Sequence, residues 1–211
     1  MAIQFLGGAA TTSTSVTIPE HRPGDLIIIF AFRNSSNIPP SVPAATATTP
    51  TWTVAASAGG NNTASVLAYA FATRAGHTSG TWANATRVWA IPVRNVAGFG
   101  AVRGNSAASS NSINYPALTP QNRNGTSVIC AFGAHSLGGS TTGIDNPPTG
   151  LTRYFAANTN SREVFHFSRK NITPILTGGL TSFSSSNVSN TFFGNWRTWV
   201  FELKVKRSMS V

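Results

Sequence analysis

The five acidic residues are the first place to look for chemistry, because hydrolysis of a glycosidic bond ordinarily uses two carboxyl groups that face each other across the substrate. These residues are Glu20, Asp25, Asp145, Glu163 and Glu202. Glu202 lies in an alternating run typical of a strand, and we expect it on the exposed face as a solvated carboxylate. Asp25 follows a turn glycine and Asp145 precedes a Pro-Pro pair, so both are expected to cap turns. The sequence therefore predicts no carboxyl pair and no enzyme.

One Glu-x-x-His spacing, from Glu163 to His166, has the form that places two metal ligands on one face of a helix. The surrounding residues alternate as a strand, however, and residues three apart on a strand point to opposite faces. His21, His77 and His135 lie near Gly or Pro residues, without a His-x-His pair or a cysteine partner. We therefore expect no metal site and no cofactor.

Nucleophilic chemistry has little support in the sequence. The only cysteine, Cys130, lies in an apolar run and is expected to be a small buried side chain. No Gly-x-Ser-x-Gly motif is present, and Gly138–Gly143 has neither the lysine of a phosphate-binding loop nor a following helical pattern. A Ser-His-Asp arrangement stays open because serine is abundant, but no catalytic residue is predicted.

Tryptophan side chains could form a platform for a sugar ring, with Asn and Asp supplying hydrogen bonds. Trp89 and Trp199 fall on the apolar sides of alternating segments, so we expect both in the core. Trp52 and Trp82 are less constrained by their neighbours, and we expect these two as surface aromatics. Glycan binding is therefore kept as an alternative function.

The chain carries fifteen Lys and Arg residues against five acids, a formal charge of +10, which favours an anionic partner. A nucleic-acid-binding protein ordinarily concentrates its basic residues on one element. Here they are scattered, so nucleic acid is not the expected partner, and single arginines are typical of protein interfaces. The expected contact residues are Arg33 and the one tight basic cluster, Lys204, Lys206 and Arg207.

The sequence pattern around the candidate residues is that of β-strands. Larger apolar side chains alternate with smaller or polar ones through 65–73, 163–167 and 197–206. Residues 26–32 are apolar on both sides, which predicts either a covered central strand or a face that meets another subunit. No apolar stripe with helical spacing is present, and charged residues make up only 9% of the chain, which disfavours a helical bundle. The predicted class is all-β.

A weak internal repeat organises these strands. Residues 24–32 and 125–132 each combine a turn glycine with an apolar run. Further along, 87–93 and 197–203 each begin with arginine and carry tryptophan two residues later. A proline-containing loop and an aromatic strand lie between these anchors in both copies. The order of the features predicts two related halves.

The predicted halves are 1–97 and 122–205, and the Ser-, Asn-, Gly- and Ala-rich stretch 98–121 is predicted to connect them. Each half supplies about four strands, and eight is the number of strands in a jelly roll. Half of the chain would bury too little core to be stable alone. We therefore expect one jelly-roll-like β-sandwich domain over 1–211.

Three features lead to a resemblance. Gly24-Asp25-Leu26 precedes an apolar run, a proline-rich loop leads to an aromatic residue at 50–53 and again at 147–154, and the closing strand contains tryptophan. Together they resemble a loosely defined family of virion proteins of tailed bacteriophages. The first copy of the loop departs from the compact form because it is stretched over 38–52. The resemblance implies a β-sandwich displayed on a capsid or tail, and it implies no catalytic residues.

We therefore expect a non-enzymatic structural protein that decorates or cements the capsid, or lies on the tail surface. Its expected partners are major capsid or other virion proteins and copies of itself. A single cysteine, no secretory-signal pattern and no apolar run long enough for a membrane span predict folding in the host bacterial cytoplasm before incorporation into the virion. The alternative is a carbohydrate-binding, receptor-recognition module of a tail fibre or tip.

Overall fold

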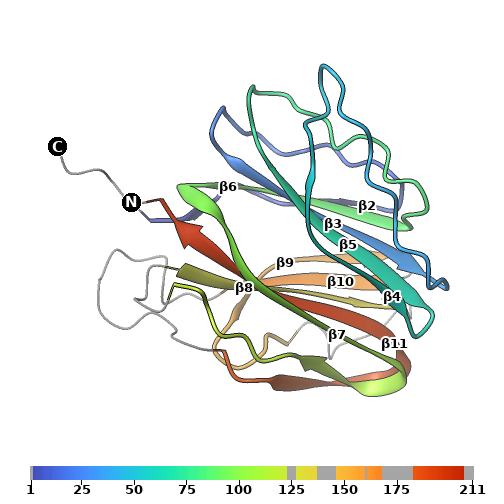
Figure 1. The fold of residues 1–211 in the computed structure, drawn as a ribbon. Coiled ribbons are helices and arrows are strands. Elements are labelled where there is room, and N and C mark those ends of the chain that lie inside the picture. The colour runs from blue at the N-terminus through green and yellow to red at the C-terminus, as the bar shows by residue number, and fades with distance from the viewer. Residues whose placement is uncertain (1, 123–126, 137–145, 160, 168–182, 207–211) are drawn as a thin grey trace. The chain divides into compact units, whose positions relative to one another are not determined.

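The computed structural model describes residues 2–122, 127–136, 146–159, 161–167 and 183–206. Within these ranges the chain forms strands and turns but no helix, so no helix is present that could cross a membrane. The all-β prediction is confirmed. The strands (Figure 1) are β1 (Gln4–Phe5), β2 (Ala9–Thr11), β3 (Leu26–Asn34), β4 (Thr53–Gly60), β5 (Thr63–Phe71), β6 (Arg87–Arg94), β7 (Val96–Tyr115), β8 (Ser127–His135), β9 (Thr152–Thr159), β10 (Ser161–Phe167) and β11 (Ser186–Val205).

The chain divides into two compact units. The N-terminal unit is Phe5–Arg94, and the C-terminal unit is Asn95–Val211 together with Met1–Gln4. Their boundary lies close to residue 97, the expected end of the first half. Each unit is built around one antiparallel sheet and is described by itself, and a single domain over 1–211 stays a prediction.

The N-terminal unit has the strand order β1-β6-β3-β5-β4, with β2 also paired to β6. The β-branched run Ile27–Ile29 suits the pleat of the central strand β3. All side chains from Leu26 to Phe32 are fully buried, so the apolar run is a central strand covered on both sides. Loops cover one face of the sheet, where the core cluster includes Val16, Ile18, Ile27, Ile29, Ala31, Trp52, Val66, Trp82 and Val88.

The C-terminal unit has the strand order β7-β11-β8-β10-β9. The expected connection at 98–121 is wrong for most of its length, because Val96–Tyr115 is the strand β7, which pairs with β11. Its small and polar side chains hide the alternation that marks a strand. The core cluster on one face of this sheet contains Ile113, Tyr115, Leu118, Ile129, Ala131, Leu151, Phe183, Trp196 and Val200.

The two sheets share an internal strand order and register. The order β6-β3-β5-β4 in one corresponds to β11-β8-β10-β9 in the other (Figure 1). Phe30 of β3 lies opposite Trp89 of β6, and Phe132 of β8 lies opposite Trp199 of β11. The strands expected to be related in sequence therefore occupy corresponding places.

The register corrects the sequence alignment of the central strands by one residue. Leu26 pairs with Val93 and Val128 pairs with Leu203, so Leu26 corresponds to Val128. Aligning Gly24 with Gly125 would instead match Leu26 to the residue before Val128. A one-residue shift moves every side chain to the other face of a strand. The corrected alignment places Ile27 and Ile129 in the two core clusters at corresponding positions.

A bulge recurs at the same place in both sheets. Strand β4 has one extra residue, Ala55, opposite the step between Leu67 and Ala68 of β5. Strand β9 has one extra residue, Tyr154, opposite the step that follows Phe165 of β10. Leu67 and Phe165 both lie opposite the phenylalanine of the central strand that faces tryptophan. Bulges are specific features of a family rather than accidents of a sheet, so their coincidence supports a true structural repeat.

Candidate functional site

The expected contact residues lie at the ends of strands. Arg33, at the end of β3, is half-buried, and its Nη1 donates to the backbone oxygen of Asn84 at 2.8 Å. Lys204, near the end of β11, is half-buried and donates from Nζ to Oε1 of Gln121 at 2.6 Å. Lys206 is exposed, and Arg207 lies outside the described residues. The structure thus places Lys204 and Lys206 at the end of one strand in the C-terminal unit, while Arg33 belongs to the N-terminal unit.

The expectation that Trp52 and Trp82 are surface aromatics is wrong. Both are buried, with ring centroids 5.8 Å apart. Both indole Nε1 groups donate to the backbone oxygen of Ser79, at 3.2 and 3.0 Å. The loops that carry them fold over one face of the sheet, so the rings close the core there and present no platform for a sugar.

The expected burial of Trp89 and Trp199 is confirmed. Each lies opposite a phenylalanine of the central strand on one side and a small residue on the other, Ala10 for Trp89 and Gly104 for Trp199. A Cβ atom at Gly104 would collide with the Trp199 ring. The indole therefore occupies the space that a side chain at position 104 would take.

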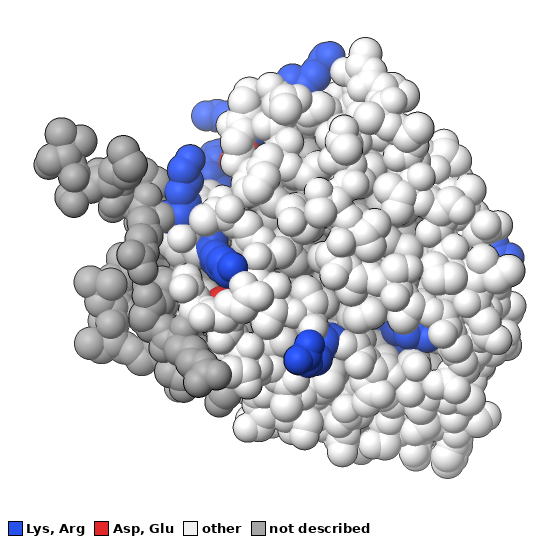
Figure 2. Space-filling model, viewed as in Figure 1, with Lys and Arg blue, Asp and Glu red and all other residues white. Residues whose placement is uncertain are grey.

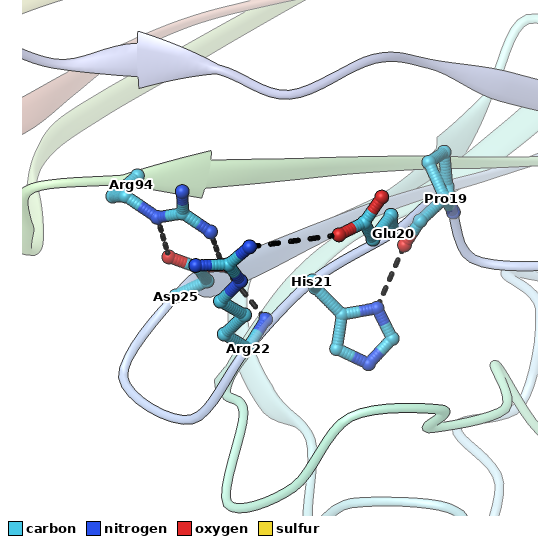
Figure 3. Close-up of polar contacts among 6 residues, drawn as sticks. All are labelled: Pro19, Glu20, His21, Arg22, Asp25 and Arg94. Atoms are coloured by element: carbon cyan, nitrogen blue, oxygen red, sulfur yellow. Dashed lines mark hydrogen bonds and ion pairs between the residues drawn. The ribbon is translucent and has the colours of Figure 1, made fainter.

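The loop before β3 ends in an ion pair between the buried Asp25 and the half-buried Arg94 (Figure 3). Nε and Nη2 of Arg94 donate to Oδ1 and Oδ2 of Asp25, both at 2.8 Å, and the backbone N–H of Arg22 donates to Oδ2 at 2.8 Å. The expected turn cap at Asp25 is thus confirmed. Burial raises the pKa of Asp25, but the hydrogen bonds from Arg94 and Arg22 and the nearby positive charge outweigh it, so the pKa lies below 3.8.

Two buried histidines from different loops lie next to each other in the N-terminal unit. The rings of His21 and His77 are stacked, with centroids 5.9 Å apart and planes 8° from parallel. The backbone N–H of His77 donates to Nε2 of His21 at 3.0 Å. The two residues are far apart in sequence and form no spacing motif, so the sequence carried no signal for this pair.

The expectation that Glu202 is a solvated carboxylate is wrong. Its side chain is fully buried and accepts four hydrogen bonds from residues that the structure describes, although it follows a polar alternation in β11. The donors are the backbone N–H groups of Ala101 (3.1 Å), Gln121 (2.7 Å) and Asn122 (3.0 Å) and the hydroxyl group of Ser127 (2.5 Å). The unrecognised strand β7 and the loop after it cover the face that looked exposed.

The electrostatics of Glu202 differ from those of a surface carboxylate. Burial raises its pKa, but the hydrogen bond from Ser127 and those from the three backbone N–H groups outweigh burial, so the pKa lies below 4.5. A Cβ atom at Gly100 would collide with Oε2 of Glu202, so only glycine fits there. Glu202 therefore joins β7, the loop at 121–122 and the start of β8 as a charged acceptor.

The remaining candidates for chemistry offer no assembled centre among the described residues. Cys130 is buried, which raises the pKa of its thiol well above the ordinary value and suits the expected apolar role. Glu163 and His166 lie on β10, which is a strand as expected, and Asp145 lies outside the described residues. Within the described part of the chain, no three His, Cys, Asp or Glu residues come together as metal ligands.

The described surface carries scattered positive charge and little negative charge. Of the acids with described side chains, Asp25 and Glu202 are buried, and Glu20 is exposed at 3.9 Å from Arg22. Figure 2 shows Lys and Arg as separate spots within a broad uncharged surface. The large apolar side chains exposed in the described ranges are Ile38, Val42, Val54, Phe71 and Phe193.

Comparisons with known proteins provide no family for this chain. No protein-family model, curated protein or solved structure matches it.

Proposed function

We propose that this chain is a non-enzymatic structural protein of a tailed phage particle, which decorates or cements the capsid or lies on the tail surface. The resemblance in the two proline-rich loops and the tryptophan strands supports this assignment. The same proposal includes the finer fold: the two sheets form one jelly-roll-like sandwich, built from a repeated four-strand unit.

The main observation behind the proposal is that two of the few acidic side chains are buried. Asp25 and Glu202 are buried and take part in internal hydrogen bonds, so the described surface keeps scattered positive charge and carries little negative charge. Such a surface repels copies of itself at long range and is attracted to an acidic partner. A phage shell with acidic outer subunits would supply that partner and allow copies to lie side by side.

Apolar contact would carry most of the adhesion. Exposed ion pairs contribute only about 0.2–1 kcal/mol each, whereas charge mainly sets orientation and association rate. The N-terminal unit exposes four large apolar side chains, which would lose water against a partner. They are Ile38, Val42, Val54 and Phe71.

The glycan-binding alternative loses its main support, because the indole rings of Trp52 and Trp82 are buried and bonded to Ser79. It is retained only as an outcome of the test. A tail-tip receptor module would be present in a few copies per particle, whereas a decorating protein would be present in hundreds.

Particle composition tests the proposal. We would purify particles of the phage that encodes the chain, count copies per particle by quantitative mass spectrometry, and locate the chain with gold-labelled antibody. Hundreds of regularly placed copies on the head, or a regular array along the tail, are expected. A handful at the fibre tip would support the glycan-binding alternative. Absence from the particle would overturn the virion assignment.

A further inference from the structure

The stacked histidines of the N-terminal unit hold three loops together. His21 lies in the loop before β3, and His77 lies in the loop that follows β5. The third loop, between β3 and β4, supplies the backbone oxygen of Thr48, which lies 2.9 Å from Nδ1 of His77. Both rings are buried, with 3% and 6% of each residue exposed. A change at either ring would therefore alter the contacts that join these loops.

The hydrogen bonds define the protons on both rings. Nε2 of His21 accepts from the backbone N–H of His77, so it carries no proton, and Nδ1 donates to the backbone oxygen of Pro19 at 2.7 Å (Figure 3). Nε2 of His77 accepts from the backbone N–H of Thr73 at 3.2 Å and lies 3.1 Å from the Thr73 hydroxyl oxygen, while Nδ1 donates to Thr48. A hydroxyl group can either donate to that nitrogen or accept from it. A neutral imidazole has one donor and one acceptor, and in each ring both are used.

The same loops hold the two tryptophan side chains that cover the core, Trp52 and Trp82. The backbone N–H of Thr78 donates to the oxygen of Thr48 at 3.0 Å, and the hydroxyl groups of Thr49 and Thr78 are 3.0 Å apart. The next residue, Ser79, supplies the backbone oxygen that holds both Trp52 and Trp82. A change at His77 is therefore transmitted through adjacent residues to the side chains that cover the sheet.

The charged groups around the pair come from three elements. The loop that carries His21 also carries Glu20, Arg22 and Asp25, and Asp25 interacts electrostatically with His21. Asp25 is neutralised by Arg94 of β6. On the His77 side, Arg74 donates to the backbone oxygen of Ala47 at 3.4 Å. Because these contacts hold the pKa of Asp25 below that of an ordinary aspartate, Asp25 keeps its charge at pH 5 and above.

We propose that His21 and His77 form an acid-sensitive latch, which holds the three loops together while both rings are neutral and releases them when His21 takes a second proton. That proton would go to Nε2, where it would point at the backbone N–H of His77. A donor would then face a donor, and the backbone N–H would lose its partner in a buried position. Two charged rings stacked on each other would add repulsion. This inference is independent of the proposed virion role.

Amide hydrogen exchange on the full chain at pH 7.5 and pH 5.0, corrected for intrinsic rates, tests the latch. If the open form binds one proton more than the closed form, acid favours opening by up to about tenfold for each pH unit. Protection at the amides of Thr73, His77 and Thr78 should therefore fall at least tenfold. The amides of Gln121 and Asn122, bound to Glu202, are the internal control and should keep their protection.

Two further measurements make the test decisive. In His21→Gln, the side-chain oxygen can accept from the His77 amide without titrating, so the loss of protection at pH 5.0 should be several-fold smaller than in the wild type. If that variant does not fold, nitrogen NMR of the wild-type imidazoles gives the answer. The latch is overturned if both rings become imidazolium while the amides of Thr73 and His77 stay protected, or if protection does not change with pH.

Discussion

The two units place different polar groups at one corresponding position, the start of the central strand. By the strand register, Asp25 in the N-terminal unit corresponds to Ser127 in the C-terminal unit. Asp25 is held by Arg94, whose side chain is 32% exposed. Ser127 instead donates to Glu202, which also accepts hydrogen bonds from the backbone N–H groups of Ala101, Gln121 and Asn122. One position thus carries the acid in one unit and a donor to the acid in the other.

This difference shows which features recur in both units and which differ between them. The Phe–Trp pairs, the bulge and the core positions at Ile27 and Ile129 recur in both units. The polar anchor does not recur, because an arginine or a set of N–H groups can each satisfy a buried carboxylate. The apolar register therefore defines the repeat, and the polar anchors adapt to the loops around them.

The largest expected effect comes from removing the shared element. Trp199→Ala should lower the free energy of unfolding by about 3–5 kcal/mol, because it leaves a cavity between Phe132 and Gly104. Trp89→Ala should have a similar effect if the two positions are equivalent. Denaturant unfolding measures both, with Phe193→Ala as the control, since Phe193 is 65% exposed. Unchanged stability of the Trp199 variant would contradict its register.

The next effect distinguishes the two polar anchors. Glu202→Gln keeps the shape but turns an NH2 group toward donors, so about 1–3 kcal/mol of stability should be lost. Glu20→Gln, at an exposed carboxylate, is the matched control and should change stability by less than about 0.5 kcal/mol. Equal stability of the two variants would mean that the donors around Glu202 do not hold its charge.

Acid should weaken both anchors. Hydrogen bonds hold the folded-state pKa values of Asp25 and Glu202 below those of ordinary carboxyl groups, so each group adds stability that is present above the ordinary pKa and is lost as the pH falls through the folded pKa. Stability should decline below about pH 4.5, by up to about 1.4 kcal/mol per pH unit and group. Glu202→Gln should make the decline shallower. An equal slope of stability against pH in the wild type and the variant would mean that Glu202 does not contribute to the acid dependence.

The sequence predicts the strands and the repeat because apolar alternation and turn glycines mark them directly. It does not predict β7, whose small side chains carry no alternation, and that omission explains the error at Glu202. A strand recognised at 96–115 would have covered the face on which Glu202 was placed. The predicted exposure of Trp52 and Trp82 was wrong for a related reason, because the local sequence pattern cannot show that a loop folds back over a sheet.

The smallest expected effect concerns the basic end of β11. Replacing Lys204, Lys206 and Arg207 by Glu should slow attachment to empty particles at low salt, with each lost ion pair contributing about 0.2–1 kcal/mol. Wild-type attachment should slow with rising salt without disappearing. The matched control reverses three exposed arginines elsewhere, Arg22, Arg74 and Arg103. Equal rates for the two triple variants would mean that net charge alone matters, and tighter binding to free DNA than to particles would contradict the assignment of the partner.

Cross-strand nuclear Overhauser contacts test the register that the two sheets share. We expect backbone protons of Phe132 to contact those of Trp199, as those of Phe30 contact those of Trp89. The sequence alignment that matches Gly24 with Gly125 would instead put Ala131 opposite Trp199. Contacts from Phe132 to Trp199 in the same pattern as Phe30 to Trp89 would establish the repeat, and contacts from Ala131 to Trp199 would contradict it.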